Sequence, residues 1–87
     1  MAVIRKKITI KNKQGLHARP AASFVQIANK FGARVTVKHQ GEKVNGKSIM
    51  GILMLGAEKD SEIIIEIEGD DAQMALLELE KIVSSEE

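Results

Sequence analysis

Apolar residues recur with two different periods along this chain, and the order of those periods restricts the fold to one class. In four short stretches they alternate with polar residues, which is typical of half-buried strands. In two longer stretches they recur at every third or fourth position, which is the pattern of one helix face. We expect strands at 3–11, 34–38, 42–44 and 63–68, long helices at 18–31 and 72–83, and a short helix at 49–55.

This order predicts an α+β fold built as a two-layer, open-faced sandwich. Each long helix has a single apolar stripe, so both helices can cover one face of a single sheet while solvent covers the other face. A length of 87 residues fits one domain, so we expect residues 1–87 to fold as a unit. Residues 84–87 are expected to fray from the last helix.

Composition excludes several classes of function. The chain has no cysteine, which excludes a disulfide scaffold, a thiol nucleophile and a cysteine-based zinc site. Its two histidines, His17 and His39, are far apart and lack carboxylates at metal-ligand spacing, so we expect no metal and no cofactor. We expect His39 at an exposed strand or turn position.

Charge and hydropathy argue against nucleic acid and membrane partners. The 13 basic and 12 acidic residues are interspersed and form no basic face. An α+β nucleic-acid-binding domain would need aromatics on the open sheet face, but Phe24 and Phe31 both fall on the first predicted helix. No apolar run approaches the ~20 residues of a membrane span, and no signal-peptide pattern opens the chain. We therefore expect a cytoplasmic protein.

The segment from Gly15 to Ala21 combines residues that suit a phosphoryl acceptor. His17 directly precedes the first long helix, whose first N–H groups lack intrahelical acceptors and attract anions. A phosphate on the His17 ring could therefore bind the amides of Ala18 and Arg19 and the Arg19 guanidinium. The positive end of the helix also favours the neutral, nucleophilic imidazole. Taken alone, however, a histidine beside a helix start is more often a loop residue without a role.

A second polar loop ends at Ser48, directly before the short helix. Its ordinary role would be an N-cap, but a kinase could also phosphorylate it beside the apolar residues Ile49, Met50 and Leu53. Exposed apolar residues there would suit a protein contact. The alternative is that this helix serves the core, and we expect three of its residues to pack inward: Ile52, Met54 and Leu55.

Residues 15–21 and 47–51 resemble the active-site and regulatory-serine segments of HPr, the histidine-containing phosphocarrier of the bacterial sugar phosphotransferase system. The resemblance covers essentially the whole chain. It implies a four-stranded antiparallel sheet with three helices on one face. It also implies that Nδ1 of His17 takes phosphate from enzyme I and gives it to sugar-specific enzyme IIA components, with Arg19 as the active-site arginine. The protein would then be a carrier and not an enzyme.

The same resemblance implies a regulatory role for Ser48. In the family, the matching serine is phosphorylated by HPr kinase/phosphorylase, which slows transfer from enzyme I and creates a form that binds a catabolite-control transcription regulator. The docking residues are expected to be Leu16, Ile49, Met50 and Leu53. We expect a monomer, because a relay protein has to dock several partners.

Two relatives within the resemblance remain as alternatives to the sugar phosphocarrier. One is a regulatory paralogue that lacks the active histidine, and the presence of His17 argues against it. The other is the phosphocarrier of the nitrogen branch, and the intact segment around Ser48 argues against that.

Overall fold

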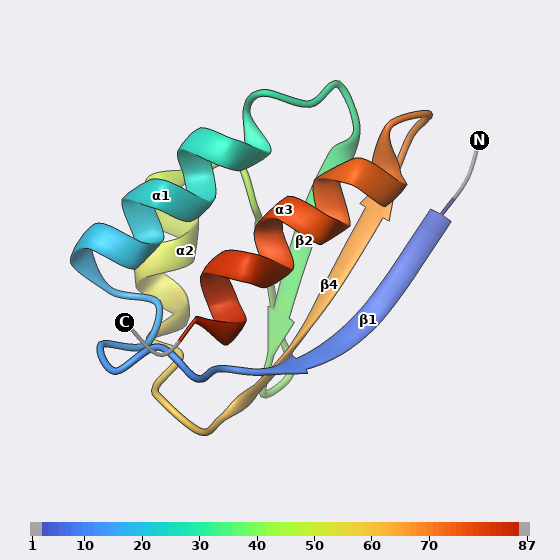
Figure 1. Cartoon of the computed structure of the whole chain (residues 1–87). Coiled ribbons are helices and arrows are strands. Elements are labelled where there is room, and N and C mark those ends of the chain that lie inside the picture. The colour runs from blue at the N-terminus through green and yellow to red at the C-terminus, as the bar shows by residue number, and fades with distance from the viewer. Residues whose placement is uncertain (1–2, 86–87) are drawn as a thin grey trace.

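The computed structural model describes residues 3–85 and has seven regular elements in an open-faced sandwich (Figure 1). The helices cover one face of a single antiparallel sheet whose strand order is β1-β4-β2-β3. The expected α+β fold with four antiparallel strands and three helices is confirmed. The strands are β1 (Val3–Thr9), β2 (Arg34–His39), β3 (Glu42–Asn45) and β4 (Glu62–Glu68), and the helices are α1 (Ala18–Ala28), α2 (Ile49–Leu55) and α3 (Ala72–Ser84).

Alternation along the two central strands builds the core. In β4, Ile63, Ile65 and Ile67 are buried, and β2 places Val37 opposite Ile65 and Val35 opposite Ile67. These side chains pack against the apolar stripes of the helices, where Phe24 of α1 and Leu79 of α3 are fully buried. The buried core is therefore aliphatic apart from the ring of Phe24, with the partly buried Phe31 packed against it.

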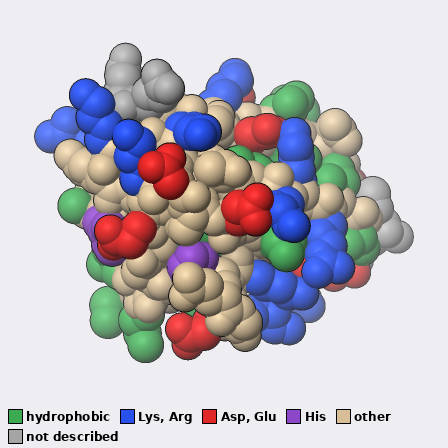
Figure 2. Space-filling model, turned by 90° about the horizontal axis from the view of Figure 1, so that it is seen from below, with side chains coloured by type: hydrophobic (Ala, Val, Ile, Leu, Met, Phe, Trp, Pro, Cys, Tyr) green, Lys and Arg blue, Asp and Glu red, His purple; other side chains and the backbone are tan. Residues whose placement is uncertain are grey.

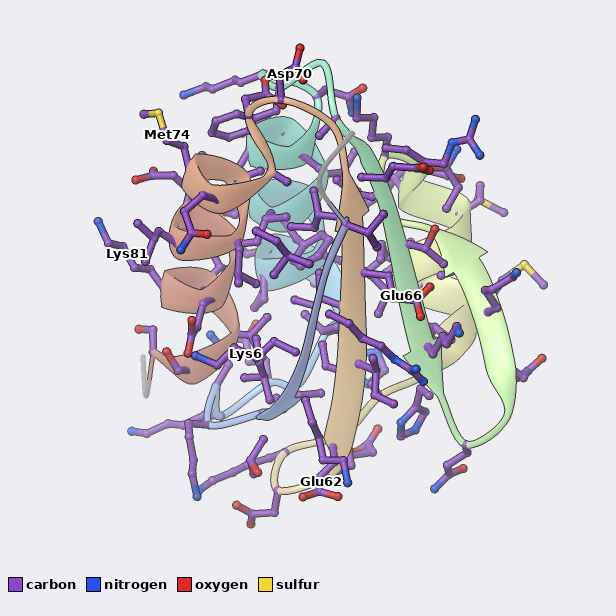
Figure 3. The ribbon with its side chains drawn as sticks, turned by 90° about the vertical axis from the view of Figure 1, so that its right-hand side faces the viewer. Lys6, Glu62, Glu66, Asp70, Met74 and Lys81 are labelled. Atoms are coloured by element: carbon purple, nitrogen blue, oxygen red, sulfur yellow. The ribbon has the colours of Figure 1, made fainter. Side chains whose placement is uncertain are left out.

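The other face of the sheet is open to solvent and carries charged side chains (Figure 3). Glu66 of β4 lies between its two neighbouring strands, 3.2 Å from Nε of Arg5 and 3.0 Å from Nζ of Lys38. The hydrogen bond from Lys38 lowers the pKa of Glu66 most. Partial desolvation opposes it by raising the pKa, and the positive charges of Lys38, Arg5 and Lys43 lower it further. Charge pairing thus joins three strands on the exposed face.

Helix α1 ends three residues before the predicted end at Phe31, and β1 ends at Thr9 instead of residue 11. At the helix end, the side chain of Asn29 donates hydrogen bonds to the carbonyls of Val25 and Lys47, at 2.9 and 3.2 Å. Contacts with the loop before α2 therefore end the helix before Gly32. Ser84 is still helical and donates its hydroxyl to the carbonyl of Glu80, while residues 86–87, expected to fray, lie outside the described residues.

The expectation that His39 is exposed is wrong. As the last residue of β2, it shares the core-facing side with Val35 and Val37, and it retains only 8% of its accessible surface. Its Nδ1 lies 3.2 Å from the carbonyl oxygen of Glu62, which can only accept, so Nδ1 is the donor. His39 therefore has a structural role at the end of the sheet.

Candidate functional site

A short loop ahead of α1 sets the position of His17. Asn12 closes this loop by accepting hydrogen bonds from the amides of Gln14, at 2.9 Å, and Gly15, at 3.1 Å. Gly15 has a φ of +66°, a conformation that favours glycine. A Cβ at this position would lie 2.5 Å from the carbonyl oxygen of Ala57, so the loop is pressed against the segment that follows α2.

Leu16 holds the loop in the core and does not belong to a docking surface. Its side chain has no accessible surface, and its amide donates to the carbonyl of Ala57 at 2.9 Å. The expectation that Leu16 contacts partners is corrected, because a fully buried side chain has no surface to offer. Leu16 instead fixes the backbone on which the next residue, His17, projects outward.

The ring of His17 is partly exposed and contacts a carboxylate. Its Nε2 lies 2.9 Å from Oε1 of Glu58, and the two side chains retain 39% and 76% of their accessible surface. A carboxylate accepts hydrogen bonds, so in the neutral ring Nε2 carries the proton and the lone pair is on Nδ1. Glu58 lies 41 positions away in sequence, and no local spacing in the sequence indicates this contact.

The start of α1 presents two amide donors next to this ring. His17 is the N-cap residue, so the amides of Ala18 and Arg19 lie where no intrahelical acceptor exists. The next residue is Pro20, which has no N–H, and Ala21 donates to the carbonyl of His17 at 3.4 Å. Ala18 has a φ of +44°, a left-handed conformation that costs an alanine about 1–2 kcal/mol. Such strain is often found at functional sites.

Arg19 is exposed and available to a ligand. Among residues 3–85, no carboxylate forms an ion pair with its guanidinium. Together with Lys81 and Gln14 it lines a surface hollow of about 390 Å³ beside Pro20. Two cationic side chains thus border this hollow, and one of them, Arg19, lies two residues after His17.

Ser48 caps the short helix α2, as expected. Its Oγ accepts a hydrogen bond from the amide of Gly51 at 3.1 Å, and the residue is partly exposed. The preceding loop is fixed by Asn45, which accepts from the amides of Lys47, at 2.8 Å, and Ser48, at 3.1 Å. A hydroxyl at this position is held at a helix start and still has access to solvent.

Four apolar side chains of α2 are exposed, and we call them the α2 patch: Ile49, Met50, Leu53 and Met54. The first three were expected there. Ile52 and Leu55 pack inward as expected, but the expectation that Met54 does so is wrong, because it retains 74% of its surface. A helix of seven residues can bury only one face, which carries Ile52 and Leu55, and Met54 lies on the opposite, exposed face.

The α2 patch and His17 lie at the same end of the molecule. Helix α2 packs against α1 (Figure 1), and Glu58, which contacts His17, follows α2 by three residues. Figure 2 looks at this end and shows apolar side chains protruding next to a histidine surface at one edge. One partner surface could therefore cover both the ring and the patch.

Within the part of the chain that the structure describes, no three side chains of the metal-ligating types are grouped to hold a metal ion. In the same residues, no helix is long and apolar enough to cross a membrane.

Comparison with known proteins finds close relatives over nearly the whole chain. The family model described as "PTS HPr component phosphorylation site" matches residues 4–85. The HPr-like protein Crh of Bacillus subtilis is 42% identical over 84 residues, which are 97% of this chain and 99% of that protein. The crystal structure of the phosphocarrier protein HPr from Bacillus anthracis superposes with a TM-score of 0.91 at 46% identity, covering 95% of this chain and 99% of that one.

The crystal structure of Crh itself, described as a dimer with a swapped domain, is less similar in shape. It has a TM-score of 0.76 at 42% identity and covers 95% of each chain. The expected monomeric state of this chain therefore stays a prediction.

Proposed function

The chain belongs to the HPr family, whose members are phosphocarriers and not enzymes, and on that premise we propose that it carries a phosphoryl group on Nδ1 of His17. One observation carries this proposal. His17 is the N-cap residue of α1, and its Nε2 lies within hydrogen-bond distance of Glu58, which leaves the Nδ1 lone pair as the nucleophile.

In the proposed step, Nδ1 of His17 attacks the phosphorus of a phosphohistidine on the donor. The new N–P bond forms as the donor's N–P bond breaks. The amides of Ala18 and Arg19 and the Arg19 guanidinium would bind the oxygens of the transferred group. The product is a phosphoramidate, which is labile enough to be passed on.

Members of this family work with proteins of the phosphotransferase system. We propose that enzyme I is the donor and that sugar-specific enzyme IIA components are the acceptors, all in the cytoplasm. The α2 patch is the proposed docking surface, because apolar side chains exposed together beside a reactive group are typical of protein contacts. Leu16 is left out of this surface because its side chain is buried.

We further propose that HPr kinase/phosphorylase modifies Ser48 and that the modified form binds a catabolite-control transcription regulator. Phosphorylation would place a charge of about −2 at the start of α2, where the helix end tolerates it. The same charge would lie next to Ile49 and Met50, which makes docking of apolar partner surfaces less favourable.

A regulatory role without phosphate transfer is the second candidate, and the relationship to the HPr-like protein Crh favours it. In that case the protein would act through Ser48 alone. The presence of His17, with its Nδ1 available, supports the carrier instead.

The two candidates separate in one assay. The purified protein is incubated with enzyme I, Mg²⁺ and phosphoenolpyruvate, and its intact mass and ³¹P NMR spectrum are followed, with His17→Ala as control. One acid-labile phosphoryl group in the wild type and none in the variant supports the carrier. No phosphorylation of the wild type by an enzyme I from the same host supports the regulatory protein.

A further inference from the structure

We propose that Glu58 is a positioning residue for His17: its carboxylate keeps the neutral ring protonated on Nε2 and stabilises the cationic ring that forms when Nδ1 is phosphorylated. This inference rests on the proposed phosphocarrier function and assigns a role to a residue outside both sequence motifs.

The contact joins two segments whose backbones are fixed. On one side, the Leu16 amide is bound to the carbonyl of Ala57 at 2.9 Å, one residue from each partner. On the other side, the carbonyl of Glu58 accepts hydrogen bonds from the amide of Ser61, at 3.2 Å, and from its hydroxyl, at 2.6 Å. The Glu58 side chain thus projects into solvent from a constrained backbone and meets Nε2 at 2.9 Å.

The chemistry of the ring explains what this contact does before transfer. A neutral imidazole has one N–H and one lone pair, and an ionised carboxylate can only accept. Glu58 therefore favours the form with the proton on Nε2 and the lone pair on Nδ1. The contact also limits rotation of the ring, so that Nδ1 faces away from Glu58 and is free to attack.

The same contact acts on the product. When Nδ1 forms its bond to phosphorus and the donor's N–P bond breaks, Nε2 keeps its proton and the ring becomes positively charged. The carboxylate of Glu58 then faces a cation, and a charge-assisted hydrogen bond is stronger than a neutral one. No further proton has to be gained or lost in this step. A carboxylate that orients a histidine and stabilises its cation acts in the same way in catalytic triads.

Two variants separate the two parts of the proposal. Glu58→Ala removes both the acceptor and the charge. Glu58→Gln keeps an acceptor, the amide oxygen, but loses the charge. The matched control is Asp70→Asn, which removes one negative charge in the turn between β4 and α3, labelled at the top of Figure 3.

The first measurement is ¹⁵N NMR of the His17 ring in alkaline solution, which needs no partner protein. We expect the wild type, Glu58→Gln and Asp70→Asn to show a protonated Nε2 and an unprotonated Nδ1. In Glu58→Ala the two ¹⁵N shifts should move toward each other as the tautomers mix. Identical shifts in the wild type and Glu58→Ala would overturn the tautomer assignment.

The second measurement is phosphorylation by potassium phosphoramidate, a small donor that replaces enzyme I, followed by ³¹P NMR and mass spectrometry. We expect Nδ1-phosphohistidine in the wild type and a mixture of ring isomers in Glu58→Ala. Both Glu58 variants should react about threefold to fivefold more slowly, since the partner is an exposed charge, and Asp70→Asn should match the wild type. Wild-type rates and a single isomer in Glu58→Ala would overturn the proposal.

These outcomes are distinct from failure of the proposed function. If enzyme I does not phosphorylate the wild type, the relay fails. The ¹⁵N shifts and the phosphoramidate reaction still decide whether Glu58 positions His17.

Discussion

The amide of Leu16 donates a hydrogen bond to the carbonyl oxygen of Ala57 at 2.9 Å, and this contact joins the loop before α1 to the segment after α2. The side chain that follows Leu16 is the proposed phosphate carrier, and the side chain that follows Ala57 is its carboxylate partner. The geometry between the two functional side chains therefore depends on backbone contacts one residue away.

Replacing Gly15 with alanine should disturb this contact. The added Cβ would overlap the carbonyl oxygen of Ala57, and alanine disfavours the φ of +66°. We expect the free energy of unfolding to fall by about 2 kcal/mol or more. The chain has no Trp or Tyr, so urea unfolding is best followed by circular dichroism.

Gly41→Ala is the control for this variant, since Gly41 has a φ of +85° but nothing within 4 Å of an added Cβ. In Gly41→Ala the free energy of unfolding should fall by only about 1 kcal/mol, the cost of holding an alanine at a positive φ. Equal losses in the two variants would show that the contact between Gly15 and Ala57 does not constrain the loop.

Ser48 should respond differently to alanine and to aspartate. Ser48→Ala removes the acceptor for the Gly51 amide and should cost about 1 kcal/mol of stability. Ser48→Asp keeps a good N-cap, so its stability should stay close to that of the wild type. Its added charge beside the α2 patch should weaken binding to enzyme I in a calorimetric titration. Equal affinity of Ser48→Asp and the wild type would contradict the docking proposal.

Arg19→Ala should slow phosphoryl transfer from enzyme I without changing stability, because the guanidinium is exposed and forms no ion pair within residues 3–85. Loss of a charge-assisted hydrogen bond to phosphate predicts about a tenfold lower rate in single-turnover kinetics. Lys30→Ala, at the opposite end of α1, removes one exposed positive charge and should transfer normally. The same loss in both variants would indicate a general charge effect.

Acid stability should depend on Glu66. Its pKa is lowered below the ordinary value of 4.5, mainly by the hydrogen bond from Lys38. A carboxyl with a lowered folded-state pKa contributes stability that is present above the unfolded-state value and is lost as pH falls through the folded-state value. Glu66→Gln should therefore lose less stability than the wild type between neutral pH and about pH 3, as measured by urea midpoints. If the urea midpoints of Glu66→Gln and the wild type fell in parallel with pH, this role of Glu66 would be contradicted.

The expected monomeric state is checked by light scattering coupled to size exclusion. A monomer gives a mass of 9.5 kDa. A stable species of twice that mass would instead match the dimer described for Crh. If such a dimer formed, the next question would be whether the α2 patch is buried between its two copies.

Periodicity in the sequence predicted the elements because each one turns a single face to the core. The alternation of Ile63, Ile65 and Ile67 is visible locally, and so is the stripe of α3. Where the end of α1 was predicted wrongly, a distant contact decided the outcome. The side chain of Asn29 ends α1 by binding the carbonyl of Lys47, and no local pattern contains that information.

The site was predictable in part for the same reason. The positions of His17 and Ser48 directly before helix starts were predicted because a helix start is a local feature, and both residues are N-caps in the structure. Their roles stay predictions. Glu58 was missed because only the folded chain brings it to His17, from 41 positions away. His39 was misplaced because its polar ring is buried by its position on the core-facing side of β2, where it finds a carbonyl partner.

The exposed methionines can serve as intrinsic NMR probes of partner binding. Met50 and Met54 place their terminal methyl groups on the α2 patch, whereas Met74 is exposed on α3, on the opposite flank of the molecule (Figure 3). Methyl labelling would therefore give a signal on each flank without any substitution. A partner that covers α2 should shift the Met50 and Met54 resonances and leave that of Met74 in place, so one spectrum identifies the docking face.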